Sequence, residues 1–271
     1  MQQEGELKER LSVLHLGLPR KLGQHFLIRD SVLERLAIAA CGEHTSRVIE
    51  IGPGRGALTK HLLRRTDELH ALELDESLVT FLQTKFSEEP KLRVHQGDVL
   101  TTDLSEWGSG IITGNLPYYI TSPIIEKFLA LGHRFPLAVF LVQWEVAERI
   151  SARPGTRDYG YLTVATQLVC DVELICKVPP SAFQPPPKVD SGAVRFHRKT
   201  QTVPNLSDLL TFVSRCFTHK RKTLRNNLKP FHYPIGLYPE ASLRAEQLSV
   251  EQFIDLHRRL SGKVELWSSH F

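Results

Sequence analysis

Four consecutive residues, Asn115-Leu116-Pro117-Tyr118, combine the groups needed to hold an aromatic ring that bears an amino group. The side-chain oxygen of Asn115 and the backbone carbonyl of Leu116 can each accept one amino hydrogen, and Pro117 adds no competing donor. Such an amino group is a poor nucleophile, because its lone pair is delocalised into the ring. Two acceptors localise that lone pair toward an alkyl donor, so the tetrapeptide is suited to N-methylation of a base.

Two aromatic residues are candidates for holding the base by its faces. Tyr118 can stack on one face, a contact worth roughly 1 to 3 kcal/mol per base. Phe183 is the candidate for the other face. No general base is expected, because a methylated ammonium is acidic enough to lose its proton to water or solvent-linked groups. Catalysis would then depend on positioning and electrostatics. In isolation, the tetrapeptide also fits an ordinary strand-end turn with a buried tyrosine.

A glycine-rich turn over residues 52–56 follows the apolar run Val48–Ile51. Glycines at such a turn let the backbone approach a ligand closely. Gly52, Gly54 and Ala57 fit the loose dinucleotide fingerprint, so a nicotinamide-dependent oxidoreductase is one alternative. We find no convincing hydride-transfer site to support it, and the turn alone indicates only a nucleotide-like ligand.

Acidic residues lie at the ends of three successive predicted strands. Glu50 precedes the glycines, Glu73 ends the second strand, and Asp98 ends the third, followed by Val99. Ligands of open α/β sheets bind at the carboxyl ends of strands. We therefore expect Glu73 to accept hydrogen bonds from ribose hydroxyls and Asp98 from an adenine amino group. The alternative is that Asp75 and Asp98 only start turns or cap helices.

Alternating strands and helices are predicted to position these residues, which indicates a mostly parallel, doubly wound α/β sheet. The predicted strands are residues 48–51, 69–74, 92–96, 111–114, 138–142, 172–178 and 193–196. The predicted helices are residues 31–40, 57–65, 77–86, 122–131 and 145–151, several with serine at the N-cap.

The pattern changes near residue 200, where we place a domain boundary. Residues 1–200 are predicted to form a Rossmann-like domain and residues 201–271 a small helical domain, with helices over 206–217, 220–228 and 249–260. The second domain holds ten Lys or Arg against six Asp or Glu, whereas the first is balanced at 24 each. This excess suits a polyanionic partner or a solvated surface. The spacing is predicted to put several cations on one helical face, suited to phosphate contacts, among Lys220, Arg221, Lys222, Arg225 and Lys229.

Composition excludes several classes of protein. The chain is 41% hydrophobic and 24% charged, as is typical of globular domains. No apolar run approaches the roughly 20 residues needed to span a bilayer, and Glu4, Glu6 and Glu9 stand where a signal peptide would be basic. The four cysteines form no CxxC pair and no zinc spacing occurs. We expect a cytoplasmic protein without a metal.

Together with the glycine turn and Asn115-Leu116-Pro117-Tyr118, three further segments resemble the ribosomal RNA adenine N6,N6-dimethyltransferase family, particularly its bacterial small-subunit (KsgA/RsmA) type. The segments are residues 21–27, residues 178–191, and residues 220–228 with 244–249. The resemblance covers nearly the whole chain. It implies a class I S-adenosylmethionine-dependent methyltransferase domain with a mostly parallel seven-stranded sheet, plus a small C-terminal helical domain that contacts RNA.

The resemblance also implies a cofactor, a substrate and a set of site residues. S-adenosylmethionine would lie among His25, Leu27, Gly52, Gly54, Glu73, Asp98, Val99 and Asn115. The expected substrate is a pair of adjacent adenines in a hairpin loop near the 3′ end of 16S rRNA, within the small ribosomal subunit and late in its biogenesis, with the enzyme acting as a monomer. His25 departs from the commoner Gln-Asn-Phe-Leu motif, which leaves the role of position 25 open.

Two related alternatives remain. A large-subunit adenine methyltransferase of the macrolide-resistance type shares the glycine turn and the Asn-Leu-Pro-aromatic motif, but the segment 183–191 and the C-terminal domain favour the small-subunit type. A non-catalytic RNA-binding assembly factor could retain the fold. The intact Asn115 and glycine turn argue against that reading.

Overall fold

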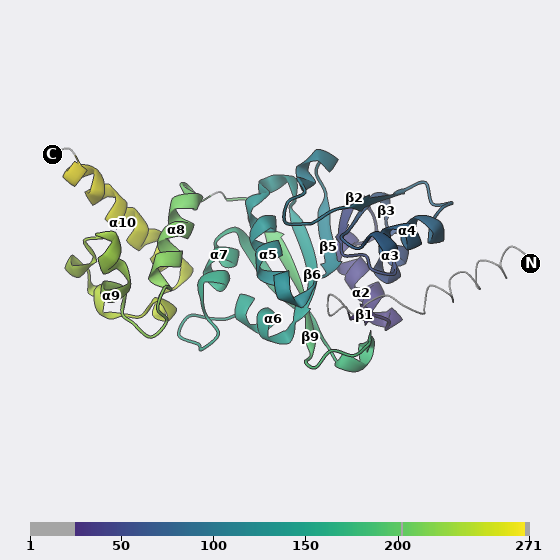
Figure 1. Ribbon diagram of the computed structural model, residues 1–271. Helices are drawn as coiled ribbons and strands as arrows, with labels where there is room; N and C mark the ends of the chain where they lie inside the picture. Colours follow the sequence, from purple (N-terminus) through teal and green to yellow (C-terminus); the bar gives the residue numbers. More distant parts are fainter. Residues whose placement is uncertain (1–24, 202, 269–271) are drawn as a thin grey trace, which may run out of the picture.

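A seven-stranded sheet forms the centre of the molecule (Figure 1). The computed structural model describes residues 25–201 and 203–268, with side chains described to residue 261; the motif residues 21–24 and the N-terminal glutamates lie outside this part. The sheet order is β4-β3-β2-β5-β6-β9-β7. All seven predicted strands are confirmed, as β2 (Thr45–Ile51), β3 (Thr66–Glu73), β4 (Leu92–Gln96), β5 (Ile111–Asn115), β6 (Leu137–Gln143), β7 (Cys170–Val178) and β9 (Ser191–Arg198).

The sheet is mostly parallel, as predicted. Strands β2 to β6 run parallel to one another, whereas β9 is antiparallel to both β6 and β7. The carboxyl ends of the parallel strands therefore meet at one edge. Their side chains alternate between the two faces of the sheet. Along β6, Val139 and Leu141 enter one apolar cluster, and Phe140 and Val142 enter the other.

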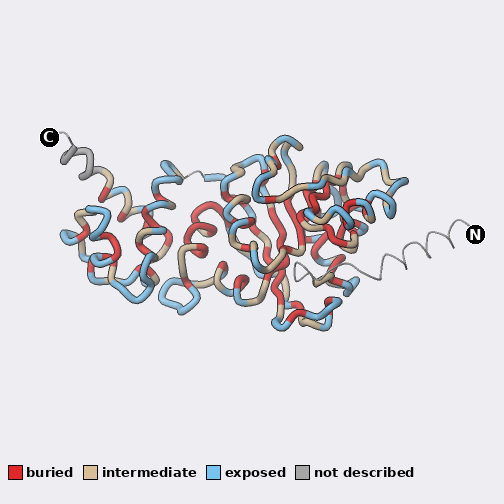
Figure 2. The backbone as a smooth tube through the Cα atoms, viewed as in Figure 1, coloured by how far each residue is buried: buried red, intermediate tan, exposed pale blue. Residues whose placement is uncertain are grey.

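Helices cover both faces, so the fold is doubly wound (Figures 1 and 2). On one face, buried residues of α2 (Asp30–Cys41) and α3 (Ala57–Leu62) belong to the same apolar cluster as Val139 and Leu141. On the other, buried residues of α5 (Thr121–Ala130), α6 (Trp144–Ile150) and α7 (Tyr161–Val169) belong to the same apolar cluster as Phe140 and Val142. Helix α4 (Glu76–Lys85) contacts β3 and β4.

Some of the expected serine caps were wrong, and three elements, α7, β1 and β8, were not predicted. Serine caps none of the five helices predicted before residue 152: Asp75 caps α4 by accepting from the Ser77 and Leu78 amides, and neither α2 nor α5 has a side-chain cap. In the C-terminal part, Ser249 does cap its predicted helix, because its hydroxyl accepts from the Gln252 amide at 3.2 Å. Helix α7 was not predicted; four of its nine residues are β-branched Thr or Val, which lowers local helix propensity. The two-residue strands β1 (Phe26–Leu27) and β8 (Phe183–Gln184), which pair antiparallel, are too short to give a strand pattern.

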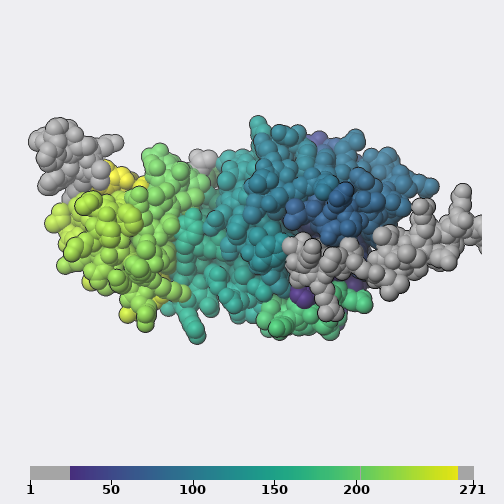
Figure 3. Space-filling model, viewed as in Figure 1, coloured from purple at the N-terminus to yellow at the C-terminus, as the bar shows by residue number. Residues whose placement is uncertain are grey.

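The C-terminal part is helical, with α8 (Leu206–Cys216), α9 (Leu224–Leu228) and α10 (Val250–Ser268). Helices α8 and α10 contact α7, and their Phe212 and Leu256 belong to the same apolar cluster as Phe140. Figure 3 shows the two parts in continuous contact. The boundary near residue 200 stays a prediction. Among the described residues, no helix is long and apolar enough to cross a membrane.

The predicted helix over 220–228 is wrong in its first half. Helix α9 begins only at Leu224, and residues 218–223 form a loop. The reason is the buried Asn227, whose side-chain amide nitrogen donates to the carbonyls of Cys216 and His219 at 2.7 and 3.1 Å. These bonds hold the loop in a non-helical path, so its cations do not share a helical face.

Candidate active site

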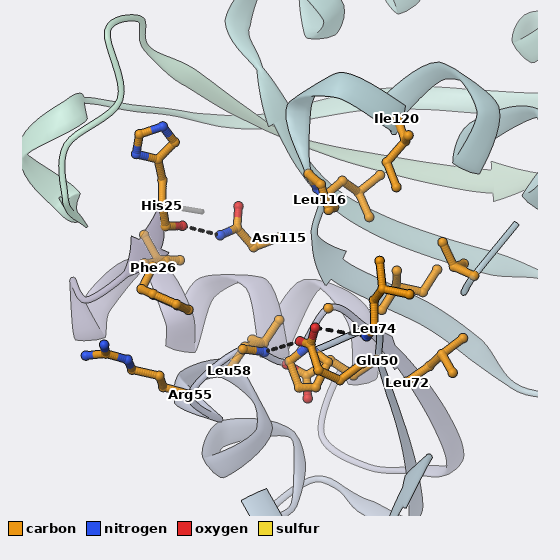
Figure 4. A pocket seen from close by; sticks show the side chains of 18 of the residues that line it. His25, Phe26, Glu50, Arg55, Leu58, Leu72, Leu74, Asn115, Leu116 and Ile120 are labelled. Carbon is orange, nitrogen blue, oxygen red and sulfur yellow. Dashed lines mark hydrogen bonds between the residues drawn. The ribbon is translucent and has the colours of Figure 1, made fainter. Parts of the chain in front are cut away.

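A pocket of about 1120 Å³, including the open space at its mouth, lies at the carboxyl ends of β2, β3 and β5 (Figure 4). Its size and mixed apolar and polar lining are typical of a site for a small organic ligand. The β1 strand closes one side. The predicted residues that line it are His25, Leu27, Gly52, Gly54, Glu73, Asp98, Val99, Asn115, Leu116, Pro117 and Tyr118.

The glycine turn is held open by the Glu73 side chain. Gly52 has a φ of +64°, in the left-handed region where a residue with a side chain is strained. One carboxylate oxygen of Glu73 accepts from the Gly54 amide at 3.1 Å, and the other accepts from the Leu74 and Asp75 amides at 2.9 and 3.1 Å. Burial raises the pKa of Glu73, while these backbone donors lower it. Glu73 therefore ties the turn to the end of β3.

Glu50 lies beneath the turn and is fully buried. Burial raises its pKa to about 8; the Thr59 hydroxyl, which donates to it at 2.6 Å, lowers the pKa, and the nearby Glu73 raises it. Glu50 is therefore largely protonated at neutral pH. Two acids can lie side by side here because only one of them needs to carry a charge.

Asp98 is half-buried at the pocket wall. One of its oxygens accepts from the Leu100 amide at 2.8 Å, so the residue does start a turn as the alternative reading supposed. Its other oxygen makes no hydrogen bond within the described residues and is available to a ligand. Asp75 lies outside the pocket lining and caps α4.

The amide of Asn115 has a defined orientation. Its nitrogen donates to the backbone carbonyl of His25 at 2.9 Å, which leaves the amide oxygen free, and Figure 4 shows that oxygen pointing away from His25. Gly114, one residue earlier, has no room for a side chain: a Cβ there would lie 2.3 Å from the Ile51 carbonyl oxygen. This close contact of β5 with β2 brings Asn115 beside the glycine turn.

His25 and Tyr118 form the far wall. The His25 Nδ1 donates to the Pro185 carbonyl at 2.8 Å, and its ring stacks on Tyr118 with centroids 5.8 Å apart. The Tyr118 hydroxyl shares a hydrogen bond of 2.7 Å with the buried Ser191. Burial raises the pKa of Tyr118, so its hydroxyl stays neutral. These contacts hold the Tyr118 ring at the pocket.

Phe183 does not line the pocket. Phe183 belongs to β8, and its side chain, 3% exposed, packs into the apolar cluster that contains Leu27 and Val178. Stacking on a base would require the ring to leave this core. That role stays a prediction, and Phe183 in the present arrangement supports the ribbon that carries His25.

Several lining residues were not predicted. Phe26 and Arg55 face each other, with the guanidinium carbon 4.7 Å from the ring centroid, and Tyr119 is 57% exposed at the pocket. Each of the three directly follows a predicted site residue in the sequence, namely His25, Gly54 or Tyr118, and this adjacency could have identified them as lining residues. Lys220, Arg221, Lys222 and Arg225 are exposed and lie outside this pocket.

The pocket thus offers acidic acceptors at two strand ends, apolar walls, and a free amide oxygen beside an aromatic ring. Three features fit S-adenosylmethionine: the positive-φ glycine turn, the Glu73 carboxylate behind it and the free oxygen of Asp98. No group of three or more His, Cys, Asp or Glu in the described part of the chain is arranged to hold a metal ion.

A family model of ribosomal RNA adenine dimethylases matches residues 18–260. The chain belongs to this family. Ribosomal RNA small subunit methyltransferase A of Coxiella burnetii (strain RSA 493 / Nine Mile phase I) is 37% identical over 252 residues, which cover 89% of this chain and 97% of the relative. The protein of the same name from Shewanella oneidensis is 38% identical over 266 residues, covering 93% and 98%.

Two solved structures are similar to this chain over most of its length. A dimethyladenosine transferase from Plasmodium falciparum superposes with a TM-score of 0.78 at 28% identity, covering 88% of this chain and 98% of that one. The 23S rRNA methyltransferase ErmE gives 0.70 at 28% identity, covering 87% and 99%. This dimethylase chain is therefore an S-adenosylmethionine-dependent methyltransferase of class I fold, and the oxidoreductase alternative is excluded.

Proposed function

We propose that this protein transfers methyl groups from S-adenosylmethionine to the N6 amino group of adenine in small-subunit ribosomal RNA. The observation that carries the proposal is the oriented amide of Asn115. Because its nitrogen is bound to the His25 carbonyl, its oxygen is the atom left to accept a hydrogen from the substrate. An amide free to rotate would present a donor half of the time and repel the amino hydrogens.

The cofactor would lie between the glycine turn and the acidic strand ends. When bound, S-adenosylmethionine supplies an electrophilic methyl group. Gly52 and Gly54 would let the backbone approach it, and Asp98 would accept from its adenine amino group through the free oxygen. Glu73 would face its ribose, using the lone pairs that its three backbone contacts leave. Leu27 and Val99 would supply apolar wall.

Catalysis would then be positioning rather than proton transfer. The Asn115 oxygen and the Leu116 carbonyl accept the two N6 hydrogens and aim the nitrogen lone pair into the cofactor side of the pocket. Pro117 keeps the chain extended with no competing N–H. The Tyr118 ring, held by Ser191 and His25, stacks on the target base.

Within the small-subunit RNA, the proposed target is two adjacent adenines in a hairpin loop near the 3′ end of 16S rRNA. An unpaired base costs less to extrude into a pocket than a paired one. The names of the curated relatives support the small subunit, and Lys220, Arg221, Lys222 and Arg225 would contact phosphates. A cytoplasmic location, action late in subunit assembly and a monomeric state belong to the same proposal.

The test is transfer of labelled methyl from S-adenosylmethionine to unmethylated small ribosomal subunits, with the modified nucleosides identified by mass spectrometry. We expect N6,N6-dimethyladenosine in the small-subunit RNA. Label in large-subunit RNA instead would support the resistance-type alternative. Binding to the subunit without any transfer would support a non-catalytic assembly factor.

A further inference from the structure

The loop over residues 218–222 is held by one buried side chain. Asn227 is 2% exposed. Its amide nitrogen donates to the carbonyls of Cys216 and His219, and its oxygen accepts from the His219 amide at 3.2 Å. All of these partners lie at one end of the loop or within it. A buried amide that is satisfied by a single loop restricts that loop to one shape.

This loop is also joined to a second loop, residues 151–160, between α6 and α7. The Lys220 ammonium donates to the Arg157 carbonyl, which links the two loops directly. The second loop also contacts another part of the C-terminal region, since the Gly155 amide donates to the Glu246 carbonyl at 2.6 Å. The second loop leaves α6, which begins where β6 ends, and the register pairs Asn115 with Leu141 near that end. Figure 1 shows the α6–α7 loop beside the C-terminal helices, at the edge of the sheet where α6 lies.

Cations are concentrated on the two joined loops. Five exposed side chains, none within 4.0 Å of a carboxylate among the described residues, are Arg153, Arg157, Lys220, Arg221 and Lys222. Asp158 is the one acidic residue in either loop. Neither loop exposes a large apolar side chain. A protein partner would be expected to meet aromatic or aliphatic residues at the centre of its interface, so this surface favours a polyanion.

We infer that the two loops form a single surface for the phosphates of RNA, with Asn227 as its positioning residue. The inference rests on the proposed function and deepens it in two ways. It adds Arg153 and Arg157, from the methyltransferase part of the chain, to the cations expected from the sequence. It also gives these cations a preset arrangement, so that less conformational entropy is lost when they meet RNA.

The first test measures binding of protein-free small-subunit rRNA over a range of KCl concentrations. Each phosphate contact contributes about 0.7 to 0.9 to the slope of log K against log salt. The double variant Arg153→Ala/Arg157→Ala should reduce that slope by about 1.4 to 1.8. Its matched control is Arg64→Ala/Arg134→Ala, which removes two exposed cations just before β3 and β6, at the amino ends of these parallel strands. This control should leave the slope unchanged.

The second test compares Asn227→Ala with Asn226→Ala, an exposed neighbour of the same residue type. We expect Asn227→Ala to weaken RNA binding about tenfold and to raise KM for the subunit with kcat little changed, because binding alone is affected. Asn226→Ala should behave as wild type. If Asn227 were only structural, Asn227→Ala would lower the melting temperature and leave both the salt slope and KM unchanged, which would overturn its positioning role.

Three further outcomes would contradict either the proposed RNA-binding surface or the proposed methyltransferase function on which it rests. A wild-type slope for Arg153→Ala/Arg157→Ala would show that the α6–α7 loop takes no part. Weaker binding of that variant to intact subunits but not to protein-free rRNA would point to a ribosomal protein as the partner. Failure of the proposed function is distinct, because then the wild-type protein itself would transfer no methyl group to the subunits.

Discussion

The amide nitrogen of Asn115 lies 2.9 Å from the backbone carbonyl oxygen of His25, 90 residues earlier in the chain. This contact joins the end of β5 to the residue before β1. It assigns the donor end of the amide to the protein and the acceptor end to the pocket. In the proposed mechanism, the β1–β8 ribbon, whose Phe183 side chain is buried in the apolar core, would contribute by holding the His25 carbonyl in place.

Replacing Asn115 by alanine should preserve the fold and abolish methyl transfer. The variant loses an acceptor for the reacting amino group, and removal of one preorganised polar group typically costs about 100- to 1000-fold in kcat. The measurement is single-turnover transfer to unmethylated subunits at saturating S-adenosylmethionine, with the melting temperature as the control for the fold. Cofactor affinity is measured separately, because Asn115 also lines the expected cofactor site. Turnover like that of the wild type would refute the mechanism.

Replacing His25 by asparagine should have a much smaller effect. The contact to Asn115 comes from the backbone carbonyl of residue 25, which the substitution retains. The asparagine amide can still donate to the Pro185 carbonyl, which His25 Nδ1 contacts at 2.8 Å. What is lost is ring stacking on Tyr118, worth about 0.5 to 1.5 kcal/mol, or roughly 2- to 10-fold in kcat/KM. A loss as large as that of Asn115→Ala would mean that the imidazole itself acts in the reaction.

Two substitutions separate the contribution of the Tyr118 ring from that of its hydroxyl. Tyr118→Phe keeps the ring and loses the bond to Ser191, so kcat/KM should fall by less than about tenfold. Tyr118→Ala also loses base stacking, worth about 1 to 3 kcal/mol, or roughly 5- to 150-fold. Ser191→Ala is the matched control and should resemble Tyr118→Phe. Equal losses in Tyr118→Phe and Tyr118→Ala would exclude stacking.

The scaffold of the site was predictable because its signals are local. Period-two and apolar runs bounded by glycine identify β2 to β6, and the acids at their ends follow directly in the sequence. A parallel sheet then requires Glu73, Asp98 and Asn115 to meet at one edge. The structure brings all three to the same pocket.

Contacts between distant segments were not predictable. The bond from Asn115 to His25 and the burial of Phe183 depend on a two-residue ribbon that gives no periodic pattern. The basic loop was mistaken for helix because its residues favour helix locally, whereas the buried Asn227 amide holds it open. Tertiary hydrogen bonds of one side chain outweighed local propensity there.

Glu50 should make the stability of the protein depend on pH. Burial raises its folded-state pKa from 4.5 to about 8, so the fold favours the neutral acid, whereas the unfolded chain ionises near 4.5. Its contribution is therefore fully present below about pH 4.5, falls as pH rises toward 8, and is constant above that. Between pH 6 and 8 the wild-type free energy of unfolding should lose about 2 to 3 kcal/mol through this residue.

The variant Glu50→Gln isolates this contribution, because an amide cannot ionise yet can still accept from the Thr59 hydroxyl. Urea unfolding at pH 6, 7 and 8 should show a flatter pH dependence in Glu50→Gln than in wild type. Glu88→Gln, at an exposed carboxyl, controls for the change in net charge and should follow the wild-type curve. Parallel curves for wild type and Glu50→Gln would mean that Glu50 is ionised in the folded protein, and that the glycine turn tolerates two negative charges at its base.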